Sequence, residues 1–60
     1  MTQDEAAKRA GVTQGFISLI LTGKRRNYDV AKALAELTKT EVALWMEGDE
    51  TEKREALRAA

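Results

Sequence analysis

The stretch GVTQGFISLILTGKRR, residues 11–26, holds the side chains whose types and spacing suggest chemistry. Gln14 can form two hydrogen bonds with the edge of an adenine, Ser18 can donate or accept one, and Leu19 can contact a thymine methyl group. Three cations that suit phosphate oxygens follow directly: Lys24, Arg25 and Arg26. Base-reading side chains beside phosphate-binding side chains favour contact with double-stranded DNA.

Helical periodicity divides this stretch into two faces, because successive side chains of a helix are separated by about 100°. The face predicted to turn inward holds Thr13, Ile17, Ile20 and Leu21. The opposite face is small and uncharged, and it holds Gly15, Ser18, Leu19 and Thr22. Gln14 and Phe16 lie at the two flanks. An uncharged face can enter the major groove, so the predicted base-reading residues are Gln14, Gly15, Ser18 and Leu19.

Each of these residues also has an ordinary structural explanation. Gln14 suits any exposed first turn, and Phe16 and Leu19 suit a core or a partner chain as well as a thymine methyl group. The basic run can be a solvated loop behind a helix carboxyl end, where cations are favourable. The formal net charge is zero, but cations prevail up to Arg26 and acids prevail over residues 41–55. Taken together in the helix-turn-helix unit that residues 3–22 are predicted to form, these features favour DNA binding.

The composition argues against an enzyme. The 60 residues suffice for one small domain and include no histidine and no cysteine, which removes most nucleophilic, acid-base and metal-binding arrangements. The acidic pairs Asp4–Glu5 and Asp49–Glu50 stand at predicted helix starts, where carboxylates interact favourably with the helix dipole. We therefore expect no catalysis, no metal and no cofactor. No segment resembles a signal peptide or a membrane span, which predicts a cytoplasmic location.

Capping signals and apolar spacing predict an all-α bundle of five short helices without strands. The first two helices meet at Gly11, a residue that tolerates a left-handed turn, and form a helix-turn-helix unit. The last helix offers few apolar side chains, so we expect it to dock weakly or to fray. The predicted ranges, all approximate, are 3–10, 13–22, 28–38, Thr40–Met46 and, behind the cap Asp49, a helix up to Ala59.

The segment TQDEAAKRAGVTQGFISLILTGKRR resembles the helix-turn-helix core of the phage-repressor and Cro-like (XRE-type) transcriptional regulators. The shared features are the two Thr-Gln pairs, Gly11 in the turn, the apolar Ile17 and Ile20, and Gly23 before the basic run. The resemblance continues through VAKALAELTKTEVALWMEG. It implies a lambda-repressor-like DNA-binding fold with a DNA-binding domain over residues 1–48 and a C-terminal helix over 49–60.

The resemblance also implies roles for individual residues. Base reading falls to Gln14, Gly15, Ser18 and Leu19 on the recognition helix, about residues 13–22. Contacts with DNA phosphates fall to Gln3, Thr13, Lys24, Arg25 and Arg26. Members of the family usually bind pseudo-palindromic sites as dimers. The chain is thus predicted to be a repressor that binds a DNA operator as a homodimer and is associated with the nucleoid when bound.

The sequence departs from the family pattern before its first Thr-Gln pair. The family normally has a further helix there, whereas here Met1 directly precedes Thr2. This predicts an uncovered apolar surface at Ala6 and Ala10, to be covered by the last helix or by a second copy of the chain, unless the chain is truncated or engineered. We expect association, because Leu57 offers little area and uncovered apolar patches tend to become interfaces.

That expectation supports a second function from another class. The same fold can serve as a protein-interaction or self-assembly module in which Phe16, Leu19 and the uncovered surface bind a partner or a second protomer. A helical scaffold without a native function is a third, weaker alternative.

Overall fold

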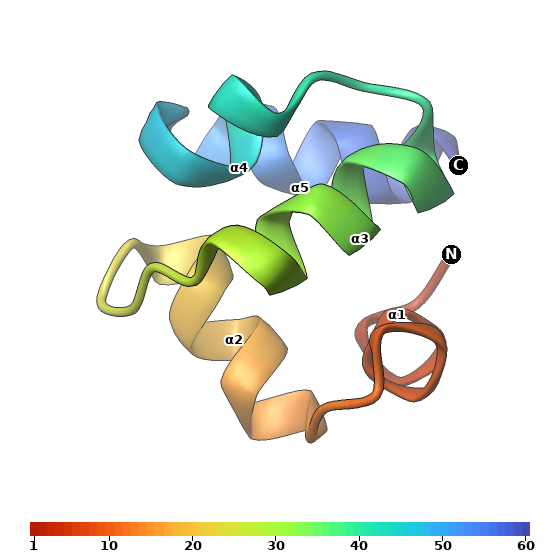
Figure 1. Ribbon diagram of the computed structural model, residues 1–60. Coiled ribbons are helices and arrows are strands. Elements are labelled where there is room, and N and C mark those ends of the chain that lie inside the picture. Colours follow the sequence, from red (N-terminus) through yellow and green to blue (C-terminus); the bar gives the residue numbers. More distant parts are fainter.

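Five α-helices make up most of the chain in the computed structural model, which describes residues 1–60 (Figure 1). They are α1 (Gln3–Ala10), α2 (Gln14–Thr22), α3 (Tyr28–Thr38), α4 (Val42–Glu47) and α5 (Glu50–Ala59). The all-α fold class is confirmed, and the predicted ranges of α1, α2, α3 and α5 match closely. None of these helices has the length and hydropathy of a membrane span.

Two helices begin with a capping box, as their sequences predict. At α1, the Thr2 hydroxyl accepts a hydrogen bond from the Glu5 backbone at 3.1 Å, and the Glu5 carboxylate accepts one from the Thr2 backbone at 3.3 Å. At α5, Asp49 accepts from the Glu52 backbone at 2.8 Å, and Glu52 completes the reciprocal bond. Both boxes satisfy backbone N–H groups that would otherwise lack partners.

Two glycines end the helices of the helix-turn-helix unit. Gly11 follows α1 with a φ of 75°, and Gly23 follows α2 with a φ of 80°. Both are left-handed conformations that cost an L-residue with a side chain more than glycine. The three residues between α1 and α2 turn the chain sharply, so the two helices lie at a steep angle in Figure 1.

All five helices contribute buried residues to the core, and α3 packs most extensively against α4. The largest fully buried side chains of the core come from α2, α3 and α4, and they are Ile17, Ile20, Leu21, Leu34 and Trp45. Three of the four residues predicted for the inner face of α2 are therefore correct. The prediction for Thr13 was wrong: this residue is exposed, because it is the N-cap of α2 and its hydroxyl accepts from the Phe16 backbone.

The start of α4 differs from the prediction. The helix begins at Val42 rather than at Thr40, and its N-cap, Glu41, makes no side-chain capping bond. The Thr40 hydroxyl instead accepts a hydrogen bond from Trp45 Nε1 at 2.9 Å and lies 2.7 Å from the Thr38 hydroxyl. Since Trp45 is only 1% exposed, its indole N–H depends on this partner.

The last helix, expected to dock weakly or to fray, lies against the core and is helical to Ala59 in the structure. Helix α5 packs against α2, α3 and α4, and it buries both Leu57 and Lys53. The surface predicted to be uncovered is closed at Ala6, which is fully buried, and partly open at Ala10, which is half-buried. The prediction counted apolar residues alone and overlooked that a lysine can bury its aliphatic stem.

Replacing Thr40 with valine is expected to lower the free energy of unfolding by about 1–3 kcal/mol, because the buried Trp45 N–H then has no acceptor. Thr40→Ser retains the hydroxyl and serves as the matched control, with a much smaller loss. Urea unfolding followed by tryptophan fluorescence measures both. Equal losses in the two variants would contradict the role assigned to the hydroxyl.

Candidate nucleic-acid interface

Two glutamines join the amino-terminal ends of α1 and α2. Gln14 Nε2 donates a hydrogen bond to Gln3 Oε1 at 3.0 Å, and the pair is exposed to solvent. Gln14 keeps its second N–H and its carbonyl oxygen free, which are the donor and the acceptor that an adenine edge requires. Gln3 keeps its amide N–H groups, which can donate to a phosphate. The bond fixes the direction of Gln14 without using up its capacity to read a base.

The predicted base-reading residues share one side of α2, although not all are equally accessible. Gln14 and Gly15 are exposed in the first turn, and Leu19 is 39% exposed one turn further on. Ser18 is half-buried. The Thr22 hydroxyl, on the same side, is occupied by hydrogen bonds to backbone carbonyls of α2. The accessible surface is therefore small and uncharged, as predicted, with its polar groups concentrated at the amino-terminal end.

Thr13 lies at the start of this surface. Its hydroxyl oxygen accepts a hydrogen bond from the Phe16 backbone N–H at 3.1 Å. Because the hydroxyl still has a hydrogen to donate, one side chain can cap α2 and bind a phosphate oxygen at once. The N–H groups of the first helical turn and the helix dipole also favour an anion here.

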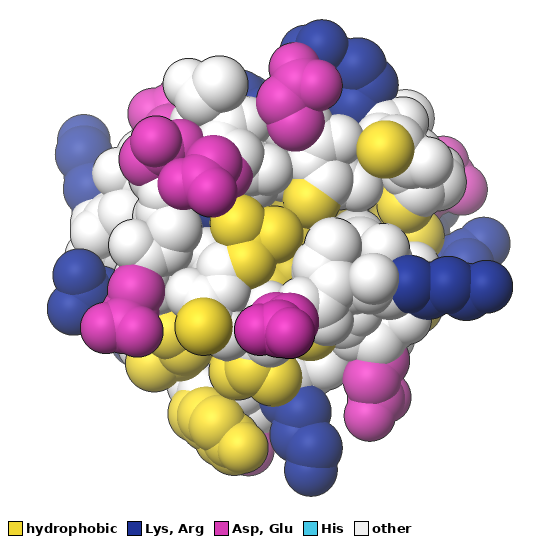
Figure 2. Space-filling view, turned by 90° about the horizontal axis from the view of Figure 1, so that it is seen from above, with side chains coloured by type: hydrophobic (Ala, Val, Ile, Leu, Met, Phe, Trp, Pro, Cys, Tyr) yellow, Lys and Arg dark blue, Asp and Glu magenta, His cyan; other side chains and the backbone are white.

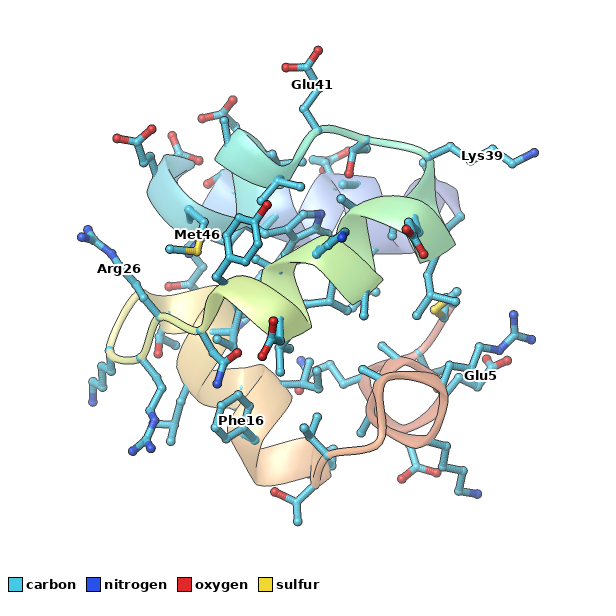
Figure 3. The ribbon with its side chains drawn as sticks, in the orientation of Figure 1. Glu5, Phe16, Arg26, Lys39, Glu41 and Met46 are labelled. Carbon is cyan, nitrogen blue, oxygen red and sulfur yellow. The ribbon has the colours of Figure 1, made fainter.

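The three consecutive cations do not act as one cluster. The backbone N–H groups of Lys24 and Arg25 both donate to the Leu19 carbonyl, at 3.0 and 3.2 Å, so the loop folds back onto the end of α2. The Arg25 guanidinium lies over the ring of Phe16, 5.4 Å from its centroid. Figure 3 shows Arg26 extending from the loop in a different direction, away from Phe16. All three cations are exposed.

Lys53 is a residue that sequence reasoning missed. Its Nζ donates to the Ile20 carbonyl at 2.7 Å, although the residue is only 4% exposed. That carbonyl is in the last turn of α2, where the helix dipole is negative and a cation is favourable. Burial lowers the Lys53 pKa, as does the positive charge of Arg26, whereas Glu50 and Asp49 act to raise it. A detectable signal was its spacing from Leu57, which puts both on one face of α5.

Many of the acidic side chains belong to the segment that contains α4 and α5. Figure 2, which looks down on the α4 and α5 side, shows acidic side chains around an apolar centre and Lys and Arg side chains toward the edge of the same face. The exposed acids of this part of the chain include Glu41, Glu47, Asp49 and Glu50. The predicted separation of charge is partial, because Asp4 and Glu5 lie on α1 and because α5 also carries Lys53, Arg54 and Arg58.

Comparison with protein families agrees with this architecture. A family model described as Helix-turn-helix matches residues 1–45, which include α1, α2, α3 and part of α4. Helix α5 lies outside the match. No curated protein and no solved structure matches the chain.

The buried lysine should give the protein a distinctive pH dependence. Because the pKa of Lys53 is lowered from 10.5 in the folded state, the folded protein loses this proton before the unfolded chain does. The unfolded state then binds more protons, so stability increases with pH up to about 10.5. We expect the free energy of unfolding of the wild type, minus that of Lys53→Met, to increase over this range.

Chemical denaturation at a series of pH values measures this difference. Lys32→Met removes an exposed lysine of α3 and serves as the control. The free energy of unfolding of Lys32→Met, minus that of Lys53→Met, should show the same increase with pH. A difference that stays flat or falls as the pH approaches 10.5 would contradict the burial of a charged Lys53.

Proposed function

The chain belongs to the Cro/repressor-like helix-turn-helix family of DNA-binding regulators, and we propose that it is a sequence-specific repressor that reads the major groove with α2. The observation that carries this proposal is the exposed Gln3–Gln14 pair at the start of an otherwise uncharged helix surface. Members of this family are usually not enzymes. The function follows from binding: a regulator that occupies its operator excludes other proteins from that DNA.

Base reading is assigned to Gln14, Gly15, Ser18 and Leu19. Gln14 suits a bidentate contact with adenine, and Leu19 suits a thymine methyl group. The only atom near the place where a Cβ of residue 15 would be is the Thr13 hydroxyl oxygen, at 4.0 Å. The protein itself therefore does not require a glycine here, and we assign to Gly15 the role of leaving space for the DNA. Ser18 can add one hydrogen bond at the edge of this surface. A contact surface of this kind can distinguish one base sequence from another, but it carries little positive charge to attract the DNA backbone.

The affinity comes from phosphate contacts by Gln3, Thr13, Lys24, Arg25 and Arg26. Gln3 and Thr13 approach one strand at the amino-terminal ends of α1 and α2, and the cations lie at the other end of α2. Phosphate contacts position a protein on DNA and release counterions, which makes binding strongly dependent on salt. The zero net charge of the chain is compatible with this, because six of its ten acids belong to residues 41–55, outside α1, α2 and the basic loop.

We further infer that the protein binds a pseudo-palindromic operator as a homodimer. Two copies place two α2 helices on successive major grooves when the half-sites are about one helical turn apart. Residues 1–48 form the DNA-binding domain in this proposal, and the C-terminal helix over residues 49–60 supports α2 from behind. The protein then acts in the cytoplasm and on the nucleoid.

A protein-interaction module is the second candidate function. Leu19 and Tyr28 are the large hydrophobic residues that remain exposed, at 39% and 59%. Leu19 lies on the proposed reading surface, so a partner chain that covered it would compete with DNA. Light scattering across protein concentrations, with and without duplex DNA, separates the two functions. Assembly that duplex DNA does not disturb, in a protein that binds no DNA, would favour the interaction module.

Removing a phosphate contact should weaken binding to every duplex and flatten its salt dependence. For Arg25→Ala and for Arg26→Ala, we expect the slope of log affinity against log salt to decrease in magnitude by about 0.9 per lost contact. Fluorescence anisotropy with labelled duplexes at several salt concentrations measures the slope. Lys39→Asn also removes one positive charge, from a left-handed position that asparagine tolerates. It should leave the slope unchanged, and slopes unaffected in both arginine variants would refute these two assignments.

Removing a base contact should change preference rather than overall affinity. Gln14→Ala is expected to lose about 1–3 kcal/mol of discrimination at one base pair while binding to random duplex is retained. Selection from a random duplex library, first with the wild type and then with the variant, identifies the operator and the affected position. An unchanged selected sequence would remove Gln14 from the base-reading set.

A further inference from the structure

Phe16 has a place on α2 that base reading does not explain. It lies at the flank of the helix, half-buried against the core, with one ring face over which the Arg25 guanidinium lies. The distance of 5.4 Å from the guanidinium carbon to the ring centroid is within the range of a cation–π interaction. The ring therefore already has a partner within the chain.

Arg25 reaches Phe16 by folding back along α2. Its backbone N–H donates to the Leu19 carbonyl, one turn closer to the helix carboxyl end than Phe16. From there the side chain reaches back to the ring of Phe16, nearer the amino terminus of α2. The guanidinium thus stands along the flank of the recognition helix instead of extending outward from the loop.

The aromatic ring is the partner that the structure gives to this guanidinium. The ion pairs of the protein use other cations, in the pairs Lys8–Asp4, Arg9–Glu5, Arg54–Glu50 and Arg58–Glu55. The Arg25 side chain forms none of the protein's hydrogen bonds either, so all its N–H donors are available to a ligand. A stacked guanidinium keeps those donors while losing much of its freedom, which lowers the entropic cost of a later contact.

We propose that Phe16 is a positioning residue that holds the Arg25 guanidinium at the edge of α2 for contact with a DNA phosphate. The inference rests on the proposed function, because it concerns how the same surface binds DNA. It assigns Phe16 neither to a thymine methyl group nor to a partner chain. The basic loop accordingly contains one cation with a fixed place beside the reading surface, while Arg26 extends elsewhere.

A double-mutant cycle tests the coupling between the two residues. Phe16→Leu should weaken binding to the selected operator and to random duplex by the same factor, about two- to five-fold, because the lost contact is a cation–π interaction at an exposed site. In an Arg25→Ala background the same substitution should have no further effect. Phe16→Tyr keeps an aromatic ring and serves as the control, with affinity close to that of the wild type.

A second variant avoids the core altogether. Arg25→Lys keeps the charge but replaces the planar group that stacks on the ring, so it should lose affinity and make Phe16→Leu less harmful. Thermal unfolding of each variant shows whether the fold is intact. A loss confined to one base pair, or an equal loss in the presence and absence of Arg25, would overturn the proposal.

An experiment without DNA separates this inference from the proposed function. In the wild type, the aromatic ring should shift the proton NMR signals of the Arg25 δ-methylene group upfield, and Phe16→Leu should abolish that shift while Phe16→Tyr retains it. Absence of the shift in the wild type would refute the pairing even if the protein binds DNA. If the shift is present but the wild type binds no duplex, the pairing stands, and both the DNA-binding function and the phosphate role of Arg25 are refuted.

Discussion

The contact between Lys53 and the Ile20 carbonyl ties α2 to α5. It joins segments 33 residues apart in the sequence and places a cation at the negative end of α2. With Lys53 buried, Leu57 closes over the core beside it, and α5 covers α2 on the side away from the proposed DNA surface. The outward side of α2 can remain uncharged and open because its inner side is buried in the core and carbonyl groups at its carboxyl end already have hydrogen-bond donors within the protein.

A chain of this size has little surplus stability, so its helix ends matter as much as its core. The core cluster contains 11 buried residues, and several of them are alanines, which contribute little apolar area. The two capping boxes, the left-handed glycines and the Trp45–Thr40 bond each satisfy groups that would otherwise be costly to fold. Local hydrogen bonding at the ends of short helices therefore compensates for a modest core.

The sequence predicts those features that are encoded locally. The capping pairs at Thr2 and Asp49 and the glycines after α1 and α2 lie within a few residues of the groups they serve, so helix boundaries could be read directly. The prediction that α4 begins at Thr40 was wrong because the Thr40 hydroxyl, which could have capped a helix, instead accepts a hydrogen bond from the indole of Trp45, five residues away. The docking of α5 depends on the approach of a segment 33 residues away from α2, and the path of Arg25 depends on how the loop folds back after α2. The family resemblance assigned residues to the DNA surface, but it gave no information on how they are held.

The two ends of α2 are fixed by different chemistry, and this division suits the role in reading DNA that we propose for this helix. At its carboxyl end, a buried lysine and the returning loop bind backbone carbonyls, so that end moves with the core. At its amino-terminal end, the bond between Gln14 and Gln3 is exposed and leaves further donors and acceptors free. A ligand can join the hydrogen-bond network at the second end without displacing anything at the first. A rigid helix with one polar, solvent-facing end pays less conformational entropy on binding than a mobile one, which compensates in part for the few charges on its reading surface.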